Sequence, residues 1–129
     1  MAEPRWLTRP IVELIHFEQL AEHGGRRGIR DENLLESAIG RPRHLWSYKS
    51  DASLTELAAS LCIGLVRDHP FVDGNKRTGF LATYAFLSIN GFELTATEDE
   101  AASTIDGVAS GTFSESELAT WLAAHTRPL

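Results

Sequence analysis

This sequence of 129 residues has little cysteine, no long apolar run and no excess of positive charge. Its single cysteine, Cys62, cannot form an intramolecular disulfide, and the N-terminal residues lack the apolar segment of a signal peptide. No apolar run approaches the ~20 residues that cross a bilayer. The formal net charge of −6 disfavours direct binding to nucleic acid or to an anionic membrane surface. We therefore expect a cytoplasmic protein that binds neither nucleic acid nor membrane directly.

Spacings typical of metal centres are missing as well. There is no Cys-x-x-Cys or His-Glu-x-x-His pattern, so a zinc site is not expected. Four scattered histidines are expected at the surface or at helix ends. They are His16, His23, His44 and His125.

The sequence has the composition of an ordinary globular domain, with 43% hydrophobic and 23% charged residues. No internal repeat, low-complexity tract or flexible linker divides it. The length fits one domain over residues 1–129.

Helix signals recur along the chain and predict an all-α fold of five or six helices with minor extended pieces. Pro10 fits the first turn of a helix that runs to about Glu22. A second helix, capped by Asp31, is expected to end at Gly40 and Pro42. Three Ser/Thr-x-x-Glu capping boxes predict three more helix starts. They pair Ser53 with Glu56, Thr97 with Glu100, and Ser114 with Glu117.

Two apolar helices are separated by a clear helix end. The preceding helix must stop before Pro70, because proline disfavours a helical backbone at the residue before it. A further helix from about Lys76 to Asn90 is apolar on most faces, as expected of a buried central helix. Residues 41–52 lack a 3.6-residue period and predict a loop or small hairpin, and residues 92–97 predict a short extended stretch.

A polar loop between the two apolar helices carries the candidate chemistry. Residues 69–77 read His-Pro-Phe-Val-Asp-Gly-Asn-Lys-Arg and lead into a helix N-terminus. Free backbone N–H groups and the positive end of the helix dipole favour an anion there, and Gly74 permits its close approach. Lys76 and Arg77 are unfavourable at this end of a helix unless an anion offsets their charge. We therefore expect phosphate to bind here.

Two further residues of the loop suit phosphate chemistry. Asp73 is the only acidic residue of the loop, and a carboxylate beside phosphates commonly holds Mg²⁺. Imidazole exchanges a proton near neutral pH, so His69 can accept one from a hydroxyl. Each residue alone has an ordinary explanation as a turn or a solvated helix end, but their combination within one short loop favours a functional site.

This loop resembles the signature of the Fic/Doc superfamily, whose common Fic form reads H-P-F-x-D/E-G-N-G-R-x-x-R. Lys76 stands where that form has glycine, and Phe80 stands where it has a second arginine. Both departures are typical of the Doc (death-on-curing) branch, whose loop ends in N-K-R-T. The resemblance covers roughly residues 10–125 and implies a compact Fic/Doc-type helical domain with a short extended flap.

The resemblance to Doc-type toxins implies a kinase that transfers the γ-phosphoryl group of ATP to a Ser or Thr hydroxyl of elongation factor Tu and so arrests translation. His69 would be the general base, with Arg77 as a second catalytic residue, and Asp73 would hold Mg²⁺. Phe71 would anchor the loop in the core. The cradle for the phosphates would consist of Gly74, Asn75, Lys76 and Arg77.

The resemblance also implies two partners. Residues 41–52 occupy the place of the family's flap, which aligns a target peptide by main-chain pairing. Leu45, Trp46 and Tyr48 are candidates for target contacts, and packing against the core is the alternative. The sequence lacks the inhibitory S/T-x-x-x-E-G/N motif of many Fic proteins. Restraint is therefore expected from a separate Phd-type antitoxin, whose C-terminal segment folds as a helix on the toxin.

Two other functions would use the same residues. A Fic-type adenylyltransferase would transfer AMP instead of the γ-phosphoryl group, but the loss of the second arginine at Phe80 argues against it. A non-catalytic module that binds a nucleotide or a partner has no need of a base, so the presence of His69 argues against that function.

Overall fold

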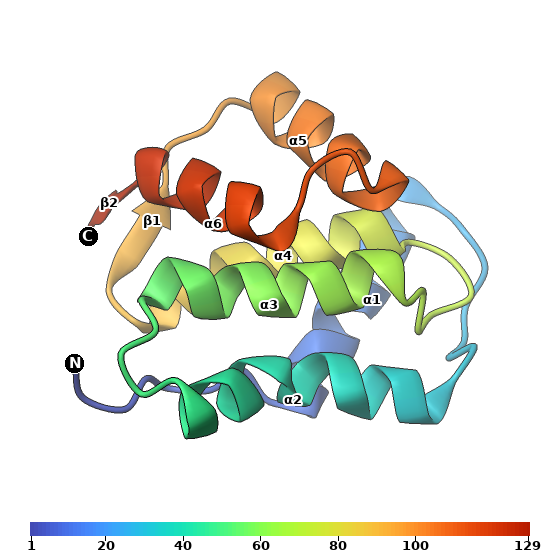
Figure 1. Ribbon diagram of the computed structural model, residues 1–129. Helices are drawn as coiled ribbons and strands as arrows, with labels where there is room; N and C mark the ends of the chain where they lie inside the picture. Colours follow the sequence, from blue (N-terminus) through green and yellow to red (C-terminus); the bar gives the residue numbers. More distant parts are fainter.

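The computed structural model describes residues 1–129 and confirms the all-α prediction. Six helices form the domain, together with one antiparallel sheet of two short strands (Figure 1). The elements are α1 (Arg9–His23), α2 (Glu32–Tyr48), α3 (Leu54–Arg67), α4 (Asn75–Ile89), β1 (Phe92–Leu94), α5 (Glu98–Ser110), α6 (Glu115–Ala124) and β2 (Thr126–Pro128). No helix is both long enough and apolar enough to cross a membrane.

Helix α3 is the centre of the core. Every residue from Leu57 to Val66 is buried, so this helix is covered on all sides rather than on one face. It packs against α2, α4, α5 and α6, and Figure 1 shows α2 on one side of it and the α5–α6 pair on the other. Helix α4 packs against α3 and α1, which fixes where the predicted functional loop must lie.

The local signals at the helix starts are confirmed. The backbone N–H of Leu34 donates to the carboxylate of Asp31 at 2.9 Å, which caps α2. All three predicted capping boxes form, at the starts of α3, α5 and α6. Each satisfies two backbone N–H groups that have no partner inside the helix.

The prediction for residues 41–52 is wrong. Helix α2 continues through Pro42 to Tyr48, so most of the expected extended flap is helical. Proline removes one hydrogen bond from a helix, but here packing compensates: Pro42 is buried and Trp46 lies edge-on against Trp6. Arg41 adds hydrogen bonds from Nε to the Ser60 carbonyl at 2.8 Å and from Nη2 to Glu115 at 2.7 Å.

The three candidates for target contacts within this segment differ in exposure. Leu45 and Trp46 are partly buried and pack against the core. Tyr48 is 77% exposed at the last turn of α2 and is therefore the one whose ring is free for a partner.

The small sheet brings the C-terminal segment next to the end of α4. Strand β1 lies within the predicted extended stretch at 92–97, whereas β2 was not predicted. Their register pairs Phe92 with Pro128. The backbone N–H of Arg5 donates to the Asn90 side chain at 2.8 Å, so the N-terminal segment lies here too. Both termini therefore lie at the C-terminal end of α4, and the α3–α4 loop lies at its N-terminal end (Figure 1).

Candidate active site

The loop from α3 to α4 is held beside the connection from α1 to α2. Ile29 forms an isolated antiparallel bridge with Phe71, and the N–H of Val72 donates to the Gly28 carbonyl at 3.0 Å. Figure 1 shows the two connections together at one end of the molecule. The loop is therefore supported from outside as well as from the core beneath it.

Phe71 anchors the loop in the core, as predicted. Its side chain is 2% exposed, and its ring stacks on the buried imidazole of His16 with 3.8 Å between centroids and 8° between planes. The expectation that His16 lies at the surface or at a helix end is wrong, because it is 6% exposed on α1. Its Nε2 lies 2.8 Å from the main-chain oxygen of Asp73, to which it donates.

Asn75 belongs to the predicted phosphate cradle, and its side chain is already engaged within the loop. It accepts a hydrogen bond from the N–H of Phe71 and donates one to the Phe71 carbonyl, both at 3.0 Å. Nδ2 also lies 3.5 Å from Nδ1 of His69, and the main-chain N–H of Asn75 has no acceptor within the chain. The Asn75 side chain thus fixes the conformation of the loop, while its backbone N–H can donate to an anion.

Gly74 is required at its position for two reasons. It is the N-cap of α4 with φ of 77°, in the left-handed region that glycine adopts without strain. A Cβ at this residue would lie 1.9 Å from Nε2 of Gln19, a buried side chain of α1. That Nε2 atom has no hydrogen-bond partner in the chain, so Gln19 fills the space under the glycine without bonding to it.

The start of α4 is an unsatisfied positive helix end. The N–H groups of Asn75, Lys76 and Arg77 have no acceptor within the chain, no side chain caps the helix, and its first turn holds no acidic residue. Lys76 Nζ lies 3.0 Å from the Asp106 carboxylate in an exposed ion pair, which contributes little and can open. Arg77 is exposed and has no ion pair. An anion fits this end of the helix.

Asp73 lies at the edge of this helix end with one oxygen available. Its Oδ2 accepts a hydrogen bond from the backbone N–H of Arg26 at 2.9 Å, while Oδ1 has no partner. The contact of Arg26 with the site comes from its main chain. No cluster of three or more metal-ligating side chains exists in the chain. One free carboxylate oxygen beside an anion site suits Mg²⁺, which takes its other ligands from phosphate and water.

His69 has an exposed side chain on a strained backbone. Its φ of 49° makes it the only non-glycine residue in the left-handed region, a conformation that costs on the order of 1 kcal/mol. The imidazole Nδ1 lies 3.5 Å from Asn75 Nδ2, the outer limit of a hydrogen bond. The main-chain carbonyl is held much more closely, at 2.6 Å from Nε of Arg30. Sequence reasoning missed Arg30, because a contact made with carbonyl groups has no residue-type signal.

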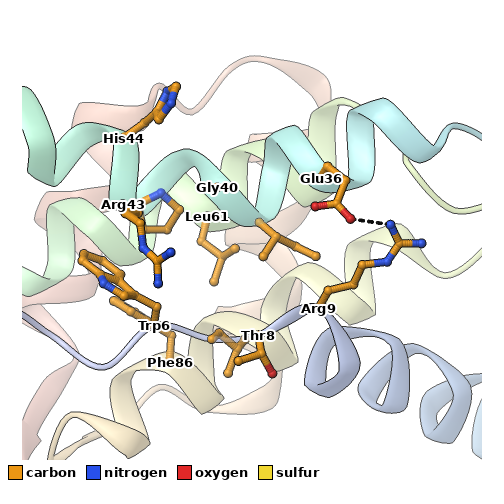
Figure 2. A pocket seen from close by; sticks show the side chains of 12 residues that line it. Trp6, Thr8, Arg9, Glu36, Gly40, Arg43, His44, Leu61 and Phe86 are labelled. Atoms are coloured by element: carbon orange, nitrogen blue, oxygen red, sulfur yellow. Dashed lines mark hydrogen bonds and ion pairs between the residues drawn. The ribbon is translucent and has the colours of Figure 1, made fainter.

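Three hollows of the molecule lie away from the loop. Their volumes are about 340 to 600 Å³, and two of them lie along α2 and α6. The third lies between the N-terminal segment and α2, where Figure 2 shows Trp6, Arg43 and the Arg9–Glu36 ion pair around it. None of these hollows is lined by a residue of the loop.

Comparison with known proteins gives matches over the part of the chain that holds this loop. The sequence model of the Fic/DOC family matches residues 6–87. Toxin Doc of Mycolicibacterium smegmatis (strain ATCC 700084 / mc(2)155) is 42% identical over 77 residues, which is 59% of each chain. Protein kinase doc of Escherichia phage P1 is 32% identical over 105 residues, 81% of this chain and 82% of that one. The alignment with the first of these relatives thus spans about three fifths of its length.

Proposed function

This chain belongs to the Fic/DOC family, and from that premise we propose that it is a Doc-type toxin kinase that transfers the γ-phosphoryl group of ATP to a Ser or Thr hydroxyl of a target protein. The observation that carries the proposal is the start of α4, where unsatisfied N–H groups and an unpaired Arg77 lie in the same loop as His69 and Asp73. The similarity to a protein named Protein kinase doc favours phosphoryl transfer.

The helix end binds the phosphates of ATP in this proposal. The N–H groups of Asn75, Lys76 and Arg77 donate to phosphate oxygens, and the dipole of α4 adds to the attraction. Lys76 leaves its exposed pair with Asp106 for the nucleotide. The Arg77 guanidinium stabilises charge on the transferring group, because its fork matches the geometry of phosphate oxygens.

His69 and Asp73 complete the reaction. The target hydroxyl oxygen forms a bond to the γ-phosphorus, the bond to the β–γ bridging oxygen breaks, and ADP leaves. His69 accepts the hydroxyl proton as general base, and its exposed side chain is accessible to a protein substrate. Asp73 holds Mg²⁺ through its free oxygen, and the bound ion offsets negative charge on the phosphates.

The target we propose is elongation factor Tu, so that the kinase arrests translation in the cytoplasm. The proposed inhibitor is a Phd-type antitoxin that binds as a helix. Its site is the set of exposed apolar side chains on α1 and α4, two helices that pack against each other. A partner helix that covers these side chains would bury their apolar surface. They are Ile11, Leu14 and Phe17 on α1, and Leu81 and Tyr84 on α4.

One experiment tests the activity. The purified chain is incubated with elongation factor Tu and Mg²⁺, using ATP labelled at either the γ- or the α-phosphate. We expect label on the target from γ-labelled ATP alone, and no label with the His69→Ala variant. The matched control is His44→Ala, because His44 is an exposed histidine of α2 away from the loop. Label from α-labelled ATP would instead make the chain an adenylyltransferase.

A second experiment addresses the antitoxin. Expression of the chain alone is expected to arrest growth, and co-expression of its neighbouring reading frames is expected to relieve the arrest. The Leu14→Asp and Tyr84→Asp variants should keep the kinase activity and escape the relief. Relief that is unchanged by both substitutions would contradict the assignment of this surface.

A further inference from the structure

We propose that Arg30 is a positioning residue for His69: it holds the strained backbone from which the imidazole is presented to the substrate. The proposal rests on the function proposed above, because it takes His69 as the general base. Arg30 lies in the connection between α1 and α2, and its hydrogen bonds go to Asp68, His69 and Pro70 and not to α4.

Arg30 binds three consecutive carbonyl groups of the loop. Its guanidinium donates from Nε to the His69 carbonyl and from Nη2 to the Asp68 carbonyl, both at 2.6 Å. Its own backbone N–H donates to the Pro70 carbonyl at 2.7 Å. One residue therefore fixes the orientation of the three peptide groups from Asp68 to Pro70. The two parallel donors of a guanidinium can span adjacent carbonyls, which a lysine ammonium cannot do in the same geometry.

The position of the His69 ring depends on this backbone more than on its own contacts. The ring is exposed, and its nearest polar partner is Asn75 Nδ2 at 3.5 Å. Its backbone is in a left-handed conformation, which persists only where the surroundings hold it. Without the two hydrogen bonds from the Arg30 guanidinium, the peptide groups on both sides of His69 can relax toward a more favourable φ. The imidazole would then move away from the hydroxyl that it deprotonates.

A merely structural role for Arg30 is the alternative. Asp68 is the C-cap of α3, and a cation at the C-terminal end of a helix stabilises the helix. In that case the loss of the two guanidinium hydrogen bonds would lower the stability of the fold and leave the kcat of the folded protein unchanged. The two roles differ in what happens to kcat, and in what happens to His69 itself.

The test compares Arg30→Lys with Arg5→Lys as the matched control, because the Arg5 side chain makes no hydrogen bond or ion pair and Arg5 lies at the opposite end of α4. Arg30→Lys keeps the charge but loses the fork. We expect kcat for phosphoryl transfer to fall by about tenfold to a hundredfold, since small displacements of a reacting group have effects of that size. The KM for ATP should change by less than about twofold, because the cradle at α4 is untouched. A kcat equal to that of the control would overturn the proposal.

A second readout does not depend on activity. The imidazole of His69, labelled with ¹³C and ¹⁵N, is followed by NMR at one fixed pH in both variants and in the original chain. We expect its ring resonances to shift in Arg30→Lys and to stay unchanged in Arg5→Lys. The assignment of the resonance comes from His69→Gln. Unchanged His69 resonances in a folded Arg30→Lys protein would refute the positioning role, even if the chain transferred no phosphate at all.

Where Arg30→Lys fails to fold, the complementary variant is His69→Gly in the presence of Arg30. Glycine adopts positive φ without strain, so it removes the conformation that Arg30 is proposed to hold. The double variant with Arg30→Lys should then recover a cooperative fold. Failure of the double variant to fold as well would mean that Arg30 acts on α3 and not on His69.

Discussion

The side chain of Asn75 and the backbone of Phe71 form a closed pair of hydrogen bonds. Asn75 Oδ1 accepts from the Phe71 N–H and Nδ2 donates to the Phe71 carbonyl, each at 3.0 Å. Both groups are buried, so neither backbone atom of Phe71 has water as an alternative. An amide is the side chain that offers one donor and one acceptor in this arrangement. Asn75, the first residue of α4, therefore also fixes the conformation of the loop before the helix.

We predict that Asn75→Ala destabilises the fold by about 2 kcal/mol, because it leaves two buried backbone groups without partners. Asn75→Asp should lose part of this stability, since a carboxylate accepts from the Phe71 N–H but cannot donate to its carbonyl. Chemical denaturation measures both. The control is Asn33→Ala, an exposed position whose side chain makes no hydrogen bond. Equal stability of the Asn75 and Asn33 variants would contradict the prediction.

We predict that Gly74→Ala costs roughly 2–4 kcal/mol, from strain at positive φ together with a clash against Gln19. Gly111 separates the two contributions: it is left-handed like Gly74, with φ of 83° and ψ of 2°, and a Cβ there would meet no atom within 4 Å. Gly111→Ala should therefore cost about 1 kcal/mol, the strain alone. Adding Gln19→Ala to Gly74→Ala should recover part of the difference. The absence of any recovery would mean that the clash is not the cause.

The helix starts could be predicted from the sequence because their signals are local. A capping box is complete within four residues, and the boxes at Ser53, Thr97 and Ser114 form as expected. The end of α2 could not be predicted in this way. Gly40 and Pro42 are correct signals for a helix end, but the burial of Pro42 and the contact between Trp46 and Trp6 come from the far N-terminal segment. Strand β2 has no alternating pattern and exists because β1 lies beside it.

The residues of the candidate site also differ in whether the sequence could predict them. The residues with distinctive chemistry, His69 and Asp73, could be named from the loop sequence, and the structure places them on one loop. The residues that support this loop could not. His16, Gln19 and Arg30 act on it from α1 and the following connection, through contacts with main-chain atoms or with a glycine. Arg67 has a structural role: it donates to the carbonyls of Val108 and Phe113 and connects α3 to the α5–α6 corner.

Acid should weaken the start of α3 in a measurable way. The pKa of Glu56 is lowered from 4.5, first by the hydrogen bond from Lys49 and then by the backbone N–H of Ser53. Because the carboxyl has a lower pKa in the folded state, its stabilisation is complete above the unfolded value and is lost as the pH falls through the folded value. We predict that Glu56→Gln flattens the loss of stability as the pH falls below 4.5.

Urea denaturation across this pH range measures the effect of Glu56→Gln. Glu18→Gln is the control, because Glu18 is exposed and has no hydrogen bond or ion pair. The control should keep the slope of the original chain. A slope that is the same in both variants would show that Glu56 contributes nothing to the acid sensitivity.

Cys62 should be inert in the folded protein. It is buried on α3, and burial raises the pKa of its thiol to about 11. The thiolate is the reactive form, so an aromatic disulfide reagent should find no reactive thiol at about pH 8 until the chain unfolds. After addition of denaturant, the reaction with Cys62 should release one equivalent of the reagent's aromatic thiolate per chain. Rapid reaction without denaturant would mean that the core around α3 opens readily.

Both chain ends lie at the C-terminal end of α4, and this determines where a label or a tether can be attached. Arg5 bonds to Asn90, and the N–H of Leu129 donates to the Gly91 carbonyl at 2.9 Å, so both ends are fixed close to the last turn of the helix. A helix of this length separates them from the loop by roughly 20 Å. A fluorescent reporter or a tether to a sensor chip, attached at either end, would leave the loop facing away from its support. Binding and transfer can therefore be followed on an immobilised molecule.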